Sequence, residues 1–328
     1  MISRRLGRAL DWRFGGVVGR LDSLRADAAR LQAQIEECNE RVAGLVASVE
    51  ALRQQTAALA RGTAAASEQA GEIWEQRTQP LLRTLVDEDA ANRRRLYDLR
   101  ASRGYEDPFR DPDPLVSIAV ATMGRALLFD RALPSLLAQT HSNLEVIVVG
   151  DAVASEIGER LAALGDPRVR FANLTQRITA HGDPRRHWLV GSTMARNEAA
   201  RLARGGWLVH FDDDDHLRPD AIASLLELAR TRRVEVAYGG VEEHHPDGSQ
   251  RTLSGFPPRL GSFSWAGALI HGGLRFFERE LVAAHLEIPG DMYALERMLR
   301  AGARFAALEA LVVLDYYPST LWEPPGDS

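Results

Sequence analysis

The chain has 328 residues, of which 45% are hydrophobic and 26% are charged, a composition that excludes a disordered protein and predicts a sizeable core. Its formal net charge of -5 argues against a nucleic-acid partner, because coating nucleic acid requires a cationic surface that displaces counterions. The one cysteine, Cys38, excludes an internal disulfide framework and is typical of a reducing compartment, so we expect a cytoplasmic protein.

Residues 1–20 predict a basic amphipathic lead-in to a longer helix. They contain five arginines and one aspartate, with apolar residues at helical intervals. A helix of this kind can lie on an anionic membrane, which would place the protein peripherally at the inner face of the membrane. The alternative is a solvated lead-in. No run reaches about 18 apolar residues, so we expect neither a transmembrane helix nor a signal peptide.

Residues 21–78 predict a coiled coil, because apolar residues step by three and four in a heptad register. The a positions hold Leu21, Ala28, Ile35, Val42, Val49 and Thr56, and the d positions hold Leu24, Leu31, Cys38, Leu45, Leu52 and Leu59. β-Branched residues at a with leucine at d favour a parallel homodimer, with a trimer as the second choice. The alternative is that this helix packs on the protein's own globular domain.

A second helix is predicted over residues 80–105, because Pro80 suits a first helical turn and Gly104 suits a helix end. Residues 106–114 follow with three prolines. They predict a stiff, extended linker.

From residue 115 to residue 322, short apolar runs alternate with helical segments, and residues 323–328 form a tail. The expected strands cover residues 115–122, 144–151, 168–174, 207–215 and 234–240, and the expected helices cover residues 127–140, 156–164, 192–205 and 219–232. This alternation predicts an α/β fold with a mostly parallel open sheet covered on both faces. Ligands of such sheets bind beyond the carboxyl ends of the strands.

Four consecutive aspartates, Asp212 to Asp215, stand where the fourth expected strand ends. Carboxylates crowded together repel one another and lose hydration, so such a cluster is most stable when a divalent cation neutralises it. Mg²⁺ or Mn²⁺ suits these oxygen ligands. The alternative is an exposed acidic turn that caps the next helix through Asp215 or Asp220.

The segments VSIAVATMGR, SLLAQTHSNLEVIVVGDA and GSTMARNEAARLARGGWLVHFDDDDHLRPD resemble the family 2 glycosyltransferases of the GT-A fold, over roughly residues 115–318. The resemblance implies a Rossmann-like domain in which Asp212, Asp213 and Asp214 match the DxD signature for the metal and the nucleotide diphosphate sugar. It implies that Asp214 holds the metal, while Asp212 lies nearer the sugar and the ribose.

The same resemblance implies a nucleotide site at the ends of the first two strands. It assigns the base and ribose to Ala121, Thr122 and Asp151, and the diphosphate to Arg196. A carboxylate at Asp151 can accept the imide N–H of uracil or thymine, which favours a UDP-sugar or dTDP-sugar. For Arg196 the alternative is a structural arginine that holds its helix against an acidic neighbour.

An inverting transfer needs a general base opposite the leaving diphosphate, and the resemblance implies that Asp291 is this base, with Glu287 in reserve. The alternative for Asp291 is a helix N-cap. His271, Trp265 and Glu287 are candidates for the acceptor site. The alternatives are a structural histidine for His271 and core packing for Trp265.

The leading hypothesis is therefore a metal-dependent inverting glycosyltransferase acting on a glycan, lipid-linked or protein acceptor in polysaccharide biosynthesis. One alternative is a non-catalytic coiled-coil scaffold, because Gly150 and Gly290 stand where the family often has acidic residues. The other is nucleotidyl transfer, although the first strand is followed by one glycine rather than a glycine-rich phosphate loop.

Overall fold

The computed structural model describes residues 48–51, 53, 79–177, 189–245, 247–259 and 261–316. The chain divides into two compact units, Met1–Thr84 and Leu85–Ser328. The predicted lead-in over residues 1–20, most of the predicted coiled coil over residues 21–78 and the tail over residues 323–328 lie outside the described residues. Ser48–Ala51 and Arg53 are helical.

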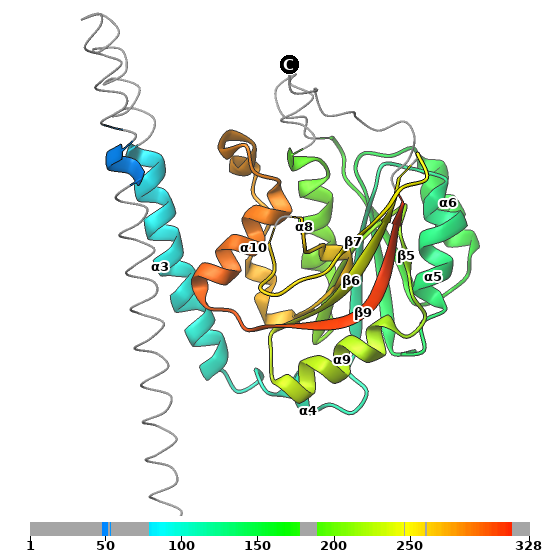
Figure 1. Ribbon diagram of the computed structural model, residues 1–328. Coiled ribbons are helices and arrows are strands. Elements are labelled where there is room, and N and C mark those ends of the chain that lie inside the picture. Colours follow the sequence, from blue (N-terminus) through cyan, green and yellow to red (C-terminus); the bar gives the residue numbers. More distant parts are fainter. Residues whose placement is uncertain are drawn as a thin grey trace, which may run out of the picture. The chain divides into compact units, whose positions relative to one another are not determined.

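The second unit is built on one curved sheet (Figure 1) with the strand order β3-β2-β1-β4-β8-β6-β9-β5 and with β7 paired to β6. The strands are β1 (Val116–Thr122), β2 (Leu144–Gly150), β3 (Val169–Asn173), β4 (Trp207–Asp212), β5 (His216–Leu217), β6 (Val236–His244), β7 (Gln250–Leu253), β8 (Ala268–His271) and β9 (Phe305–Tyr316). The first four strands in this order are parallel. β8 runs antiparallel to both β4 and β6, and β9 runs parallel to β6. The predicted open α/β sheet is confirmed.

The helices surround this sheet. They are α3 (Gln79–Ala101), α4 (Asp107–Arg110), α5 (Leu133–Leu137) after a π-helical turn (Leu128–Ala132), α6 (Ser155–Ala163), α8 (Thr193–Leu202), α9 (Ala221–Arg232) and α10 (Gly290–Ala301). Short 3₁₀ turns cover Trp265–Gly267, Gly272–Phe276 and Leu281–Leu286. Among the helices of the described ranges, none is long and apolar enough to cross a membrane.

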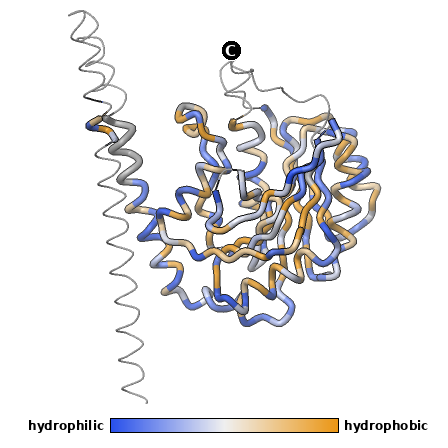
Figure 2. The backbone as a smooth tube through the Cα atoms, viewed as in Figure 1, coloured by the Kyte–Doolittle hydropathy of each residue, from blue (hydrophilic) through white to orange (hydrophobic). Residues whose placement is uncertain are grey.

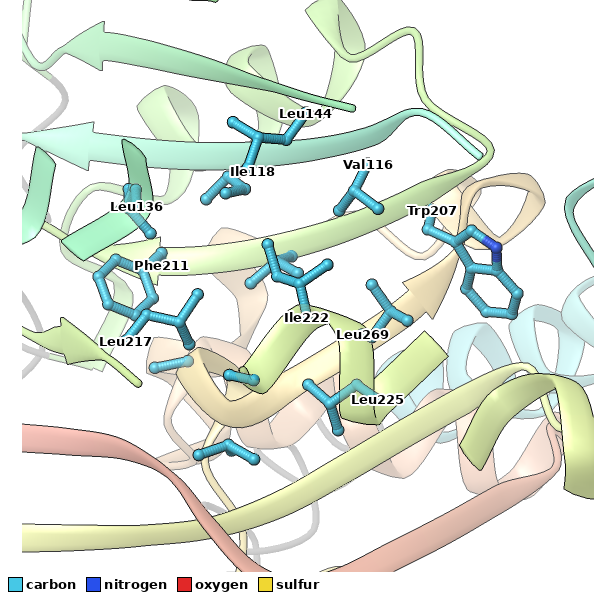
Figure 3. Packing of buried hydrophobic residues seen from close by; sticks show 14 of the residues in the cluster. Val116, Ile118, Leu136, Leu144, Trp207, Phe211, Leu217, Ile222, Leu225 and Leu269 are labelled. Carbon is cyan, nitrogen blue, oxygen red and sulfur yellow. The ribbon is translucent and has the colours of Figure 1, made fainter. Parts of the chain in front are cut away.

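Strands β1 and β2 are apolar on successive residues because both faces of the sheet are covered. Every residue of both strands is buried. One face packs Ile118 against Ile222 of α9 and against α5 and α6, and Figure 3 shows Ile118, Phe211 and Ile222 gathered in this cluster. The other face packs Ala119 against Ala199 of α8. Figure 2 shows that hydrophobic positions follow the central strands and hydrophilic positions the outer loops.

The segment after α3 differs from the extended linker that its prolines predict. Asp107–Arg110 form the short helix α4, and Phe109 is buried in the main core cluster. Trp207 donates from Nε1 to the carbonyl oxygen of Pro108 at 3.1 Å, while its ring meets Phe109 edge to face. Burial of this aromatic side chain stabilises a compact turn over an exposed linker.

A buried carboxylate ties the end of α3 to the sheet. Glu235, fully buried at 0% exposure, accepts from Arg100 Nε at 2.9 Å and from Arg304 Nη2 at 2.8 Å. Tyr105 donates its hydroxyl to the same carboxylate. Burial raises the pKa of Glu235, but the hydrogen bonds from Arg100 and Arg304 outweigh it and lower the pKa to about 2. The region from Leu85 onward is thus part of the domain that holds the sheet.

We expect Glu235→Ala to lower the free energy of unfolding by about 2 to 4 kcal/mol, because it leaves two guanidinium groups without their shared anion. Urea denaturation of the full chain at pH 7 measures this loss. Asp98→Ala, which breaks an exposed pair with Arg94 on α3, is the control and should cost less than about 1 kcal/mol.

The same pair of variants gives a pH dependence. Because the folded-state pKa of Glu235 lies below its ordinary value of 4.5, its contribution is complete above that value and is lost as the pH falls toward about 2. The difference between wild type and Glu235→Ala should therefore shrink in that window. A difference that is constant across it would contradict the assignment.

Candidate functional site

The carboxyl ends of β1, β2 and β4 meet at one edge of the sheet. Ala121 lies opposite Asp212 in the β1–β4 register, and Thr122 lies opposite Gly150 in the β1–β2 register. The backbone N–H of Asp151 donates to the carbonyl oxygen of Thr122 at 2.9 Å. The predicted positions Ala121, Thr122, Asp151 and Asp212 are therefore brought together at the edge where open α/β sheets bind ligands.

The four aspartates cover the last residue of β4 and the turn that follows it, together called here the aspartate turn (Asp212–Asp215). Asp213 is 4% exposed and accepts from the Thr122 hydroxyl at 2.6 Å. Arg125, in the loop after β1, places Nη1 3.2 Å from Asp213 Oδ1 and also pairs with Asp214 Oδ2. Arg131 donates to the carbonyl oxygen of Asp214 at 2.9 Å. Guanidinium groups from two segments thus meet this turn.

Asp212 differs from its neighbours in both exposure and partner. Its side chain is 40% exposed and pairs with Arg196 of α8. Burial raises the pKa of Asp212, but Arg196 and Arg279 outweigh it and lower the pKa. For Asp213 the balance is opposite, because burial raises its pKa more than Arg125 and Thr122 lower it.

These ion pairs show that positive charge other than a divalent cation also neutralises the four adjacent aspartates. Arg125 and Arg196 supply positive charge from the chain itself. Within the described part of the chain, no cluster of three or more His, Cys, Asp or Glu side chains is arranged to hold a metal ion. Two carboxylates of the turn, Asp212 and Asp214, nevertheless provide the hard oxygen donors that Mg²⁺ and Mn²⁺ prefer.

Asp291 lies within electrostatic reach of the aspartate turn. Burial lowers the pKa of Arg196, but its attraction to Asp212 and to Asp291 outweighs burial and raises it. Asp291 is the second residue of α10, and its Oδ1 accepts from the backbone N–H of Met292 at 2.7 Å. The candidate base and the candidate metal ligand therefore share one arginine between them.

Trp265 and Glu287 differ in burial: Trp265 is buried, whereas Glu287 is exposed. Trp265 is 5% exposed and donates from Nε1 to the carbonyl oxygen of Asp291 at 2.8 Å, so its indole fixes the start of α10. Glu287 adopts the left-handed conformation with φ 56° at the end of a 3₁₀ turn.

Arg279 is a site residue that the sequence did not suggest. Burial and the nearby Arg196 lower its pKa to about 10, against the attraction of Asp291 and Asp212. The side chain of Asn197 fixes its backbone, donating to the Arg279 carbonyl oxygen at 2.8 Å and accepting from the Arg279 N–H at 3.0 Å. No sequence signal marks Arg279, whereas Arg125 carries one, because it stands three residues after the end of the first strand, Thr122.

The second strand's end has its own arginine. Asp151 is 3% exposed, its Oδ2 lies 3.5 Å from Arg177 Nε, and its carbonyl oxygen accepts from the same guanidinium at 3.2 Å. The preceding residue, Gly150, has no room for a side chain, because a Cβ at this position would lie 2.5 Å from Asn173 Oδ1. Asn173 fills the place of a side chain at position 150.

His271 was expected at the acceptor site, and this prediction is wrong. His271 pairs with Trp207 at the start of β4, whereas Asp212 ends β4, so the two lie at opposite edges of the sheet. It is 2% exposed, and its Nε2 lies 3.0 Å from the carbonyl oxygen of Tyr105. Its ring stacks on Phe109 at 5.3 Å. A Cβ on Gly272 would lie 2.7 Å from the carbonyl oxygen of Gly205, so this glycine permits close packing of two backbone segments.

The fold and this edge define an open α/β domain whose polar site stands at the carboxyl ends of parallel strands. A family model described as "Glycosyl transferase family 2" matches residues 184–286, a range that includes the aspartate turn and Arg279. The rest of the site, including Asp291 and the end of β1, lies outside the matched range.

Two curated bacterial proteins are similar to part of this chain. The succinoglycan biosynthesis protein ExoO of Rhizobium meliloti (strain 1021) is 33% identical over 141 residues, which cover 43% of this chain and 37% of that protein. The putative colanic acid biosynthesis glycosyl transferase WcaA of Escherichia coli (strain K12) is 34% identical over 116 residues, which cover 35% of this chain and 37% of that protein. The matched part of the chain thus spans just over a third of each relative.

A solved structure, that of S. aureus TarS residues 1–349, aligns with 62% of this chain and 60% of that chain, with a TM-score of 0.47 and 16% identity.

We expect His271→Ala to lower the free energy of unfolding by about 2 to 4 kcal/mol, because it removes a ring from the aromatic cluster at the start of β4. Glu287→Gln, an exposed change, should stay within about 0.5 kcal/mol of wild type. Urea denaturation of both variants checks this. Equal stabilities for the two variants would show that His271 has no core role.

Proposed function

We propose that this chain is a glycosyltransferase that moves a sugar from a nucleotide diphosphate sugar to a hydroxyl group, with inversion at the anomeric carbon. The observation that carries the proposal is that the aspartate turn lies beside the ends of β1 and β2, and that Arg196 pairs with Asp212 and is also attracted by Asp291. The family match over residues 184–286 supports it.

We assign a divalent cation, Mn²⁺ or Mg²⁺, to Asp212 and Asp214, whose carboxylate oxygens suit these hard ions. When bound, such an ion supplies charge stabilisation for a leaving diphosphate. Arg196 is the group that we assign to the diphosphate oxygens, because a guanidinium binds phosphate in a fork. Its present partner is the half-exposed carboxylate of Asp212.

Asp291 is assigned the role of general base. An inverting transfer needs a carboxylate that accepts the proton of the acceptor hydroxyl as the new bond to the sugar forms. Asp291 Oδ1 is bonded to the Met292 N–H, and the hydrogen bond from Trp265 to the Asp291 carbonyl holds the backbone at this position. We therefore assign Trp265 to positioning the base.

The donor is proposed from the residues at the ends of β1 and β2, and the acceptor from the relatives of this chain. Asp151, beside Ala121 and Thr122, can accept the imide N–H of uracil or thymine, so we favour a UDP-sugar or dTDP-sugar. Arg177, which pairs with Asp151, would then share this carboxylate with the uracil or thymine ring of the donor. The names of the two curated relatives mention succinoglycan and colanic acid biosynthesis, which supports a glycan acceptor in polysaccharide biosynthesis. A lipid-linked or protein acceptor is the alternative. A homo-oligomer through residues 21–78 remains our prediction for assembly.

Incubation of the full chain with UDP-glucose, UDP-galactose, dTDP-rhamnose or GDP-mannose and Mn²⁺ should release nucleoside diphosphate from one uridine or thymidine donor by slow hydrolysis. EDTA should abolish the release, because the leaving diphosphate then lacks its counter-charge. Asp214→Asn is the matched control and should behave like the EDTA-treated protein. No release from any donor, together with no metal-dependent nucleotide binding, would contradict the proposed function.

With the active donor in hand, Asp291→Asn should reduce kcat by about 10² to 10⁴-fold, the range of a general base, and leave donor affinity nearly unchanged. Glu287→Gln, a neighbouring exposed carboxylate, should keep kcat within about twofold if it takes no part in proton transfer. Kinetics and calorimetric donor binding on the same samples separate the two effects. An equal loss of turnover and of donor affinity in Asp291→Asn would remove the base assignment.

A further inference from the structure

Arg125 contacts the buried part of the aspartate turn. Its Nη1 contacts Asp213 Oδ1 at 3.2 Å and pairs with Asp214 Oδ2. The two carboxylate side chains are 5% and 12% exposed, whereas that of Arg125 is 31% exposed. One guanidinium therefore covers two aspartates and keeps its own outer side open to solvent.

The backbone conformation of the residues before Arg125 directs this residue toward Asp213 and Asp214. Gly124 adopts φ 87°, a left-handed conformation that a residue without Cβ adopts readily. Its N–H donates to Thr122 Oγ1 at 3.0 Å, and the same hydroxyl donates to Asp213 Oδ2. The turn after β1 is thus bonded to the carboxylate that Arg125 neutralises.

Arg125 and a divalent cation need the same oxygens. The carboxylate that we assign to the metal, Asp214, is the one that pairs with Arg125 through Oδ2. Two cations in contact with one oxygen repel each other strongly where water is scarce. A metal ion entering alone would therefore have to displace Arg125 from Asp214.

We propose that Arg125 is a built-in competitor of the metal ion: it holds Asp213 and Asp214 when no donor is bound, and it transfers to the donor's diphosphate when metal and nucleotide enter together. The inference rests on the proposed function. A guanidinium binds phosphate oxygens in a fork as it binds carboxylate oxygens, so Arg125 can exchange its two aspartates for the diphosphate. Metal and nucleotide then bind cooperatively, and each tightens the other by the same factor.

The test measures Mn²⁺ binding to the full chain by calorimetry at pH 8, with and without UDP. Without UDP, Arg125→Gln should bind Mn²⁺ about fivefold more tightly than wild type, because the variant lacks the partly exposed ion pair with Asp214 that competes with the metal. Arg125→Lys keeps the positive charge and should stay near wild type. Arg168→Gln, which breaks a pair with Asp166 away from the site, controls for the change in net charge.

With UDP present, wild-type Mn²⁺ affinity should rise about tenfold or more, and the rise should be smaller in Arg125→Gln because its neutral side chain cannot follow the diphosphate. Circular dichroism confirms that each variant is folded. The inference is overturned if Arg125→Gln binds Mn²⁺ no more tightly than wild type without UDP. If that variant fails to fold, a wild-type Mn²⁺ affinity that UDP does not change overturns it equally.

These outcomes are separable from those of the proposed function, because metal binding is measured without turnover. Tighter Mn²⁺ binding by Arg125→Gln in a chain that releases no diphosphate from any donor would support the competition and reject the transferase. Active turnover together with equal Mn²⁺ affinities of wild type and Arg125→Gln would support the transferase and reject the competition.

Discussion

The neutralisation of buried carboxylates by arginines from distant segments is the constraint on which the rest of this domain depends. A carboxylate as buried as that of Asp213 is costly unless a cation and hydrogen bonds accompany it. Here Arg125 and Thr122 come from the end of β1, and Arg196, which serves Asp212, comes from α8. The parallel pairing of β1 with β4 is what brings these groups to one place.

At the opposite edge of the sheet, arginines also neutralise a buried carboxylate, but this carboxylate is not left open to bind a ligand. Glu145, at the start of β2, is 3% exposed and accepts from Ser117, Arg170 and Arg204. Burial raises its pKa, but these hydrogen bonds outweigh it and lower the pKa to about 2. Glu145 thus acts as a structural junction, whereas the half-exposed Asp212 keeps a face toward solvent.

The helix that carries Asp291 is held from α3 as well as from the sheet. Arg297 of α10 is 3% exposed and pairs with Glu88 of α3 and with Glu280, and it donates to the carbonyl oxygen of Glu278 at 2.8 Å. Arg300 pairs with Asp89 at 2.9 Å. These contacts flank Arg279 and fix α10, so the second half of α3 helps to place the groups around Asp291 although it lies some two hundred residues away in the sequence.

The sequence by itself determined the layers of the domain and the location of its site. Continuous apolar runs marked the buried strands β1 and β2, and the four aspartates marked the end of β4, because burial on both faces and the polarity change at a strand end are local properties. The short strand β8 and the long strand β9 were not predicted, since their pairing with β6 is set by residues far away in the chain.

Only the tertiary structure decided which side chains meet. It gave the aspartates arginine partners instead of leaving them to a metal ion alone, turned residues 107–110 into a helix around Phe109, and moved His271 into the core at the far end of β4. Each of these outcomes depends on which strands lie side by side, and strand order is a long-range property that no local pattern of residues contains.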